Sequence, residues 1–524
     1  MHTLAPQEVS LNGEASKSIR IGMFVCLGGF VFGYDAVVIS GVTEAVTVRF
    51  GLSDWQLGWI VSIPTLTAMF ASLAVGVLSD VFGRRPLLML VTLLYVCSAI
   101  LSVTANGFAD LVIARGIGGL AFSSLVLAPL YLAEISPSSF RGRIVSMNQL
   151  AIVLGLSAAY FGNLLIQRLS HVDTGWIVEL GIRDHAWRWM FAMELVPASL
   201  WLVLVALAVP ESPRWLVLHG RLAAARQIMA RLYPSERVEA LLDRVRASGG
   251  ATGTGRRIAW TAFLSRPVIA ALGVGLIVAV AQQISGVNAI YFYAPVVFQQ
   301  SGVGVDAAFA QATLLGSTNV VFTLVAMGLI DRLGRKPLLL GGLAGAGMSL
   351  AVVAWGFSQA GYVLQADAVA ALPEAVRAHE LTGLINRDFP NDVTYKAALV
   401  DVLGPRLFSA HEAELIGAAI SVPASLILAG ILCFVASFAV SLGPVMWVVL
   451  SEIFPNHIRG ACIALLAFVN GATSFGVQLA FPVQLVTLGV ATTFAFYAVA
   501  AFLFFGLVFF FLPETRGRTL EQAG

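Results

Sequence analysis

The residues best suited to hold a polar solute lie near the middle of the chain, in the segment 282–295 (QQISGVNAIYFYAP). This segment stands inside an apolar run from about 268 to 298. Two adjacent glutamines and an asparagine are costly in lipid, because lipid offers no hydrogen bonds. Gly286 and Pro295 predict a broken or unwound helix. Interrupted polar helices form mid-membrane binding sites in many transporters, so we expect these amides to hold a hydroxyl-rich solute.

Further amides and aromatic residues in other apolar runs complete the candidate binding site. Amides both donate and accept hydrogen bonds, so they suit hydroxyl groups better than a fixed charge does. Taken singly, each could equally form an interhelical hydrogen bond or a core contact. That alternative is weaker for the adjacent glutamines, whose side chains point about 100° apart on a helix. The candidates are Phe32, Gln149, Gln282, Gln283, Asn288, Tyr293, Asn319, Trp447 and Asn470.

Three ionisable residues inside apolar runs, Asp35, Arg115 and Glu194, are candidates for proton coupling. Each lies about seven or eight residues from the outer end of its span. At 1.5 Å per residue this places all three roughly 10–12 Å deep. Ionisable residues at such depth are expensive and mark functional sites. We expect Asp35 to take and release the proton, with Arg115 as its switchable partner; a static ion pair that fixes helix register is the alternative.

The composition defines the elements that position these residues. Of 524 residues, 58% are hydrophobic and 11% charged, whereas a soluble domain carries about 25% charged residues. The sequence therefore predicts an all-α membrane protein with about 20 residues in each span. The twelve predicted spans lie at about 20–43, 56–79, 86–104, 108–132, 144–167, 187–209, 267–298, 308–330, 337–358, 416–450, 459–485 and 489–512.

The chain repeats its own motifs in two halves. Residues 80–86 (DVFGRRP) recur as 331–337 (DRLGRKP), and PESPR at 210–214 recurs as PETR at 513–516. Glu134 with Arg141 recurs as Glu452 with Arg459. These repeats predict two six-span halves with a site between them. The predicted divisions are a tail 1–19, a half 20–210, a linker with short helices 211–263, a half 264–512 and a tail 513–524.

Basic residues cluster in the loops after even-numbered spans, so these loops and both termini are predicted to be cytoplasmic. Paired charges at this rim are expected to latch the halves together when the outer side is open. The predicted gate residues are Asp80, Arg84, Arg85, Glu134, Arg141, Asp331, Arg335, Lys336, Glu452 and Arg459.

The second half is longer than the first by about 67 residues, which lie around 359–416. We expect this insertion to be a partly helical cap or a mobile loop on the outer face, without an assigned function. No nucleotide-binding motif or metal-ligand spacing is present in the sequence. No enzyme activity, cofactor, metal or nucleic-acid partner is therefore predicted, and transport must be driven by a gradient.

With these motifs the chain resembles the sugar porter family of the major facilitator superfamily. The resemblance rests on DVFGRRP, YLAEISPSSFRGR, PESPRWL, QQISGVNAIYFYAP, DRLGRKP, GPVMWVVLSEIFPNHIRG and PETRGRTLE. It implies a twelve-helix transporter that binds sugar between its halves. The segment FGYDAVVISG around Asp35 is similar to bacterial proton–sugar symporters, whereas passive animal facilitators usually carry a neutral residue there.

The resemblance also assigns site residues. Gln149, Gln282, Gln283, Asn288 and Asn319 match positions that hold sugar hydroxyls in the family, and Trp447 matches a tryptophan that lines the cavity. The chain departs from the xylose symporters at three positions, where it carries Phe292, Leu442 and Gly471. A hexose, another pentose or inositol therefore remains open.

We expect a monomeric importer of a monosaccharide, coupled to protons, in the cytoplasmic membrane. The alternatives are an uncoupled sugar facilitator and an inositol– or polyol–proton symporter. A sugar sensor and a drug exporter are disfavoured by the short C-terminal tail and by the amide set.

Overall fold

The computed structural model of the protein describes residues 14–136, 141–232, 238–240, 242–243, 245–246, 265–379, 381–455 and 458–514. Twelve segments in this part of the chain are long and apolar enough to cross a membrane. They confirm the predicted all-α membrane fold. Their bounds are Ile19–Gly41, Asp54–Phe82, Arg84–Thr104, Phe108–Ile135, Ser146–Leu169, Ala186–Ala208, Arg266–Phe292, Val305–Ile330, Arg335–Ser358, Ala424–Glu452, Arg459–Thr487 and Val490–Phe511.

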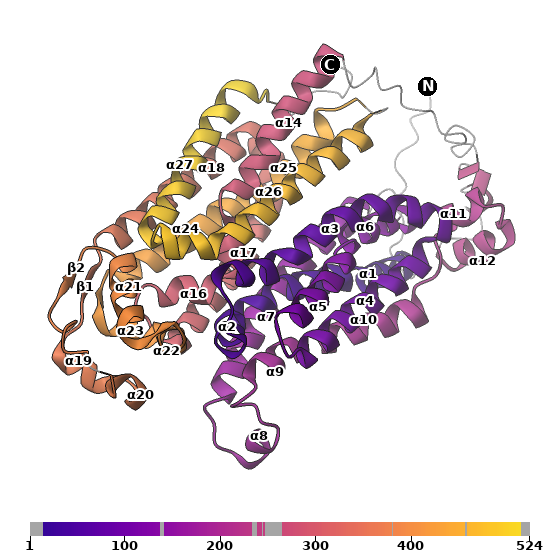
Figure 1. Ribbon diagram of the computed structural model, residues 1–524. Coiled ribbons are helices and arrows are strands. Elements are labelled where there is room, and N and C mark those ends of the chain that lie inside the picture. The colour runs from indigo at the N-terminus through magenta and orange to yellow at the C-terminus, as the bar shows by residue number, and fades with distance from the viewer. Residues whose placement is uncertain are drawn as a thin grey trace.

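The first six spans form one helical bundle, drawn in indigo to magenta in Figure 1. Most of these spans are single long helices, but the fourth and sixth are each divided into two. The helices of this half are α1 (Glu14–Val38), η1 (Ile39–Gly41), α2 (Thr43–Phe50), α3 (Asp54–Phe82), α4 (Arg84–Thr104), α5 (Phe108–Ala121), α6 (Ser124–Ile135), α7 (Arg141–Leu169), α8 (Gly175–Glu179), α9 (Ala186–Ala192) and α10 (Leu195–Ala208).

The last six spans form the second bundle, drawn in pink to yellow (Figure 1). Between the bundles the described linker contains α11 (Pro213–Leu218) and α12 (Leu222–Leu232). The helices of the second half are α14 (Arg266–Ile284), α15 (Val287–Phe292), α16 (Ala294–Gln299), α17 (Val305–Leu333), α18 (Arg335–Ser358), α24 (Ala424–Val440), α25 (Leu442–Glu452), α26 (Arg459–Thr487) and α27 (Val490–Phe511).

The repeated motifs build the same turn in both halves. Gly83 and Gly334 each link two spans with a positive φ, of 99° and 92°, which glycine adopts without a steric penalty. A carboxylate then caps the helix that follows: Glu211 accepts hydrogen bonds from the backbone N–H of Arg84 and Arg85, at 2.9 and 3.2 Å. Glu514 accepts from the backbone N–H groups at positions 335 and 336, both at 3.1 Å. Free N–H groups at a helix start need such acceptors, which explains why the Pro-Glu motif recurs.

The insertion is a small α/β unit, partly helical as one of the two predicted alternatives has it, with short strands that the sequence did not predict. Its three strands, β1 (Gly361–Val363), β2 (Asp388–Phe389) and β3 (Ile420–Ser421), form a sheet in the order β2-β1-β3. Both pairings are antiparallel, with Tyr362 opposite Phe389 and Ile420. Its helices are α19 (Ala366–Ala371), α20 (Glu374–Arg377), α21 (Asp392–Leu403), α22 (Pro405–Ala410) and α23 (Glu412–Ala419).

This unit has its own apolar core, which includes Tyr362, Tyr395, Leu399 and Leu415. Because α23 and β3 belong to it, the tenth span begins at Ala424 and not near 416 as predicted. Figure 1 places the insertion and α8 at one end of the molecule, and α11 and α12 at the opposite end. We refer to these as the insertion end and the linker end.

Candidate functional site

The seventh span is interrupted where the sequence predicted a break. Helix α14 ends at Ile284, and Gly286 then adopts a φ of +82°. A Cβ atom at this glycine would lie 3.0 Å from the ring of Tyr497, so both the turn and the packing favour glycine. A second interruption at Tyr293 separates α15 from α16, which has Pro295 in its first turn. The seventh span therefore consists of two helical pieces, α14 and α15, and α16 follows it directly.

Four of the predicted amides meet at this interruption. Gln283 donates through Nε2 to Oε1 of Gln282 and to Oδ1 of Asn470, both at 3.2 Å. Asn470 donates through Nδ2 to Oε1 of Gln282 at 3.0 Å, and Asn288 donates to Oε1 of Gln283 at 2.9 Å. Gln282 itself donates to the backbone oxygen of Leu442 at 3.0 Å. We call Gln282, Gln283, Asn288 and Asn470 the amide cluster; it joins α14, α15 and α26.

Three further polar residues extend the amide cluster and were not predicted. Asn288 donates to Oγ of Ser474 at 2.7 Å, and Gln478 donates to the same oxygen at 2.7 Å. Gln478 also donates to Oγ1 of Thr65 at 3.0 Å, which joins the two halves. The sequence contained the signal, because residues 470, 474 and 478 recur every four positions and so share one face of α26.

The other predicted binding residues are distributed around this cluster. Tyr293 is buried and donates to the backbone oxygen of Gln478 at 3.2 Å. Asn319 is buried on α17, and Phe32 packs edge-to-face on Phe122 with ring centroids 4.7 Å apart. Gln149 on α7 is exposed, and Trp447 on α25 is 45% exposed. Within the described residues, Phe32, Gln149, Asn319 and Trp447 form no hydrogen bond to the amide cluster.

One departure from the xylose symporters has a structural explanation. A Cβ atom at Gly471 would lie 2.5 Å from Cγ of Met69, so the methionine of one half fills the space beside this glycine of the other half. The two halves therefore approach closely next to Asn470, at a position where a large aromatic side chain would not fit.

The predicted proton-coupling residues converge inside the first half. Arg115 on α5 donates through Nη1 to Oδ1 of Asp35 on α1, and through Nη2 to the backbone oxygen of Asp35 at 3.2 Å. Glu194, at the break between α9 and α10, lies close enough to both charges to interact electrostatically. Asp35, Arg115 and Glu194 are all at most 2% exposed. A Cβ atom at Gly118 would approach Oδ2 of Asp35 to 3.0 Å, so this glycine makes room for the carboxylate.

Several buried polar atoms around this ion pair have no hydrogen-bond partner among the described residues. They are Oδ2 of Asp35, Nε of Arg115, Oε1 of Glu194 and the hydroxyl of Tyr34. Buried polar groups are normally satisfied, and exceptions need an explanation. Two carboxylates share one guanidinium here, so the group has the capacity to bind a proton.

At the linker end the predicted gate residues form ion pairs within each half. Arg84 pairs with Glu134 and with Asp80, both at 2.9 Å. In the second half Arg335 pairs with Glu452 at 2.8 Å. Three other basic gate residues donate to backbone oxygens of their own half: Arg85 to Ala206, Lys336 to Phe509 and Arg459 to Phe454.

All the ion pairs named above lie within one half, and none of them is the predicted latch between the halves. The side chains of Arg141 and Asp331 lie outside the described residues. The sequence predicts the latch for the state in which the outer side is open, and the latch therefore stays a prediction.

The ion pairs predict different sensitivities of the two halves to the same substitution. Arg84 and Glu134 each expose 6% of the side chain, whereas Arg335 and Glu452 expose 15% and 24%. Removing one partner of a buried pair costs about 3–5 kcal/mol, and exposed pairs contribute much less. We expect Glu134→Ala to lower the melting temperature in detergent clearly more than the matched variant Glu452→Ala. Equal shifts would contradict this interpretation of burial.

Besides the contacts of Thr65 and Met69 with α26, further contacts join the halves near the insertion end. Gln299 of α16 donates to Glu44 of α2 at 3.0 Å. Gln167 of α7 donates to Asp306 of α17 at 3.2 Å. Between α7 and α17, Gly316 packs against Ser157 and Tyr160. Among the residues described, no ion pair joins the halves at the linker end. The structure is thus closed at the insertion end.

The fold and this site define a class of protein: a duplicated membrane transporter with interrupted spans. The sequence profile described as "Sugar (and other) transporter" matches residues 21–371 and 407–524. The arabinose-proton symporter of Bacillus subtilis is 30% identical over 525 residues, covering 99% of this chain and 98% of the relative. The chain therefore belongs to the sugar transporter family, as a transporter and not an enzyme.

Solved structures agree with this assignment. The inward-open conformation of the xylose transporter XylE from Escherichia coli matches with a TM-score of 0.72 at 26% identity, covering 97% of this chain and 99% of that one. The proton:xylose symporter XylE bound to 6-bromo-6-deoxy-D-glucose matches with a TM-score of 0.66 at 28% identity, covering 98% and 99%. The protein has the major facilitator superfamily fold and is a multi-pass protein of the plasma membrane.

Proposed function

We propose that the protein imports a monosaccharide together with a proton by alternating access. The observation that carries this proposal is the buried group of Asp35, Arg115 and Glu194, because ionisable residues buried in membrane spans are expensive and mark functional sites. The similarity to an arabinose-proton symporter along almost the whole chain supports both the sugar and the proton.

In this proposal the two ligands bind to different halves. The proton binds at Asp35 in the first half, where Arg115 stabilises the ionised carboxylate and releases it when the proton arrives. Sugar hydroxyls bind at the amide cluster in the second half, and must replace amide–amide hydrogen bonds that now satisfy the cluster. Phe32, Gln149, Asn319 and Trp447 then complete the sugar site from the facing elements.

We propose that the linker end faces the cytoplasm, because basic residues cluster in its loops. The insertion end is then the outer end, and the present state is open to the inside. The match to the inward-open xylose transporter supports a state that is open to the inside.

Sugar-induced proton uptake tests the proposal. Proteoliposomes in weakly buffered medium without a gradient receive glucose, galactose, xylose, arabinose or inositol in turn. We expect the substrate among them to raise the external pH transiently, and a protonophore to abolish this change. A sugar that enters without changing the pH would identify a facilitator, and a response to inositol alone would identify a polyol symporter.

A further inference from the structure

A buried polar network at the insertion end joins the two halves to the insertion. Glu44 of α2 accepts a hydrogen bond from Nε2 of Gln299, 3.0 Å away on α16. The next residue, Gln300, accepts from Nζ of Lys396 on α21 at 2.7 Å and donates to Oε1 of Glu412 on α23 at 3.2 Å. Lys396 also pairs with Glu412 at 3.1 Å. We call these five residues the insertion-end network.

The network is shielded from water where it passes through α16 and α21. Gln299, Gln300 and Lys396 are 6%, 5% and 8% exposed. A lysine at such burial requires compensating partners, since an unpaired buried charge is strongly unfavourable. Lys396 has two of them, the amide oxygen of Gln300 and the carboxylate of Glu412. The insertion is therefore held on α16 by the charged group of Lys396.

The insertion is also anchored elsewhere on the second half and touches the first half. The backbone N–H of Val490, at the start of α27, donates to Oδ2 of Asp392 at 3.2 Å. Helix α22 of the insertion contacts α2 of the first half, as Figure 1 shows beside α16. The insertion thus belongs to one half and reaches across to the other.

The position of α16 links the contact between the insertion and the first half to the opening of the insertion end. Helix α16 directly follows the span that carries Gln282, Gln283 and Asn288, and the interruption at Tyr293 separates it from α15. Opening the insertion end must break the bond between Glu44 and Gln299 and separate α2 from α22. Every contact that holds the insertion on α16 therefore bears on that opening.

We propose that the insertion clamps α16 against α2 through Lys396 and Glu412, and so biases the protein toward the state closed at the insertion end. Glu44 makes this clamp sensitive to the pH of the solution at that end. The inference goes beyond the transported sugar and rests on the alternating access proposed above.

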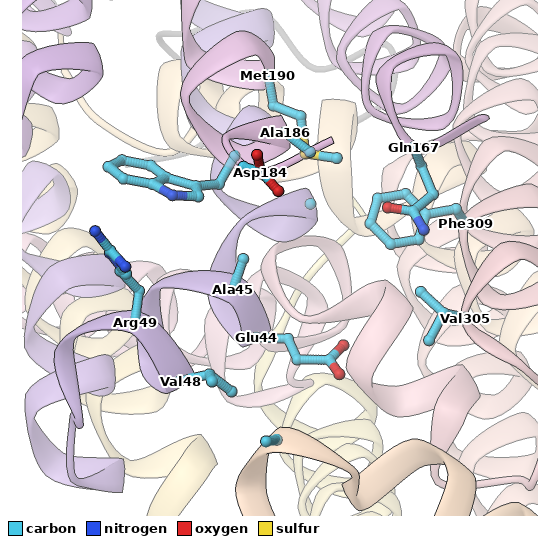
Figure 2. A pocket seen from close by; sticks show the side chains of 13 residues that line it. Glu44, Ala45, Val48, Arg49, Gln167, Asp184, Ala186, Met190, Val305 and Phe309 are labelled. Carbon is cyan, nitrogen blue, oxygen red and sulfur yellow. The ribbon is translucent and has the colours of Figure 1, made fainter. Parts of the chain in front are cut away.

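The surroundings of Glu44 determine the direction of the pH effect. Figure 2 shows Glu44, Arg49, Asp184 and Gln167 around a cavity of about 410 Å³ at the insertion end. Burial is the main cause that raises the pKa of Glu44 to about 7. The hydrogen bond from Gln299 lowers this pKa, and the charges of Glu412 and Glu414 raise it. The other charged or titratable groups nearby are Asp54, Lys396, His411 and the cross-half pair of His171 with Asp306.

Protonation of Glu44 therefore favours the closed state. When the insertion end opens, Glu44 becomes solvated and its pKa returns toward the ordinary value of about 4.3. The closed state then binds the proton more tightly than the open state. The ratio of closed to open molecules therefore grows as the pH falls through 7, and this gain is lost as the pH rises above 7. Between pH 8 and pH 6 the ratio of closed to open molecules rises by up to about tenfold.

Distance measurements between spin labels test the clamp. Thr104→Cys at the end of α4 and Leu488→Cys after α26 place exposed labels on the two halves at the insertion end. The four native cysteines are replaced by alanine. We expect Lys396→Met to lower the closed-to-open ratio at least fivefold, and Arg377→Met, which removes an exposed charge of the insertion, to leave the ratio unchanged. Glu44→Gln should abolish most of the change between pH 8 and pH 6.

Two outcomes would overturn the clamp. The two label-to-label distances report the closed and the open state. Equal proportions of these states in the wild type and in Lys396→Met would overturn the clamp alone, provided that hydrogen exchange shows α21 still folded. If Lys396→Met unfolds the insertion, Glu412→Gln, which keeps the side-chain shape, takes its place with the same expectation. A single distance in every variant, at every pH and with sugar present would overturn the clamp together with alternating access.

Discussion

Replacing Asp35 with asparagine should abolish gradient-driven accumulation of sugar while leaving sugar exchange across the membrane intact. Asparagine keeps the shape of the side chain and still accepts a hydrogen bond from Arg115, but it cannot carry a proton. A gradient of two pH units can drive up to ~100-fold accumulation if one proton accompanies each sugar, since each unit is worth about 1.4 kcal/mol. In Asp35→Asn the internal concentration should reach only the external one.

Two further variants make this result interpretable. Asp110→Asn carries the same substitution at an exposed carboxylate of the same half and should accumulate sugar as the wild type does. Glu194→Gln tests the second buried carboxylate. If Glu194→Gln abolished accumulation and Asp35→Asn did not, Glu194 would be the coupling residue and the assignment of Asp35 would be wrong.

Replacing Gln283 with alanine should weaken sugar binding by about 10- to 100-fold. This side chain contributes three of the hydrogen bonds within the amide cluster, to Gln282, Asn470 and Asn288. Losing one or two hydrogen bonds to sugar hydroxyls costs about 1.4–2.7 kcal/mol. Binding is measured at one fixed pH, by calorimetry or by competition with a labelled substrate in detergent, where no proton gradient acts.

The control for this experiment is Gln484→Ala on α26. Gln484 accepts a hydrogen bond from Tyr497 at 2.8 Å, outside the amide cluster, and its loss should leave the affinity unchanged. Unchanged affinity in Gln283→Ala, and likewise in Asn288→Ala, would remove the cluster from the sugar site. Equal losses in Gln283→Ala and Gln484→Ala would indicate a general disturbance of the second half.

Much of this architecture is visible in the sequence, because membrane spans leave strong signals. Long apolar runs, duplicated loop motifs and the polar break at Gly286 predicted the twelve spans, the two halves and the interrupted seventh span, and the structure contains them all. Burial of charge was equally informative: Asp35, Arg115 and Glu194 stood out as single residues in apolar segments, and they converge in space.

Other features depend on contacts that a linear pattern does not contain. The strands of the insertion are only two or three residues long, too short for alternation to reveal them. Apolar residues of α23 ran into the tenth span, which moved the predicted start of that span to about 416. Glu211 and Glu514 appeared as parts of motifs, but their capping role became clear only when α4 and α18 lay beside them.

The residues of the insertion-end network show the same limit. Gln299 and Gln300 continue an apolar run, and they meet Glu44 and Lys396 only because several spans return the chain to the same end of the bundle. The sequence alone assigned the insertion no function, and the proposed clamp now gives it a testable role.

The most direct test of the account is the accumulation of radiolabelled sugar by proteoliposomes of the wild-type protein, with an imposed inward proton gradient and the membrane potential held at zero. Proton symport predicts that the internal concentration of the substrate rises transiently above the external one, and that it only equilibrates when the gradient is absent. Equal uptake with and without the gradient would contradict proton coupling and leave an uncoupled transporter with structural buried charges.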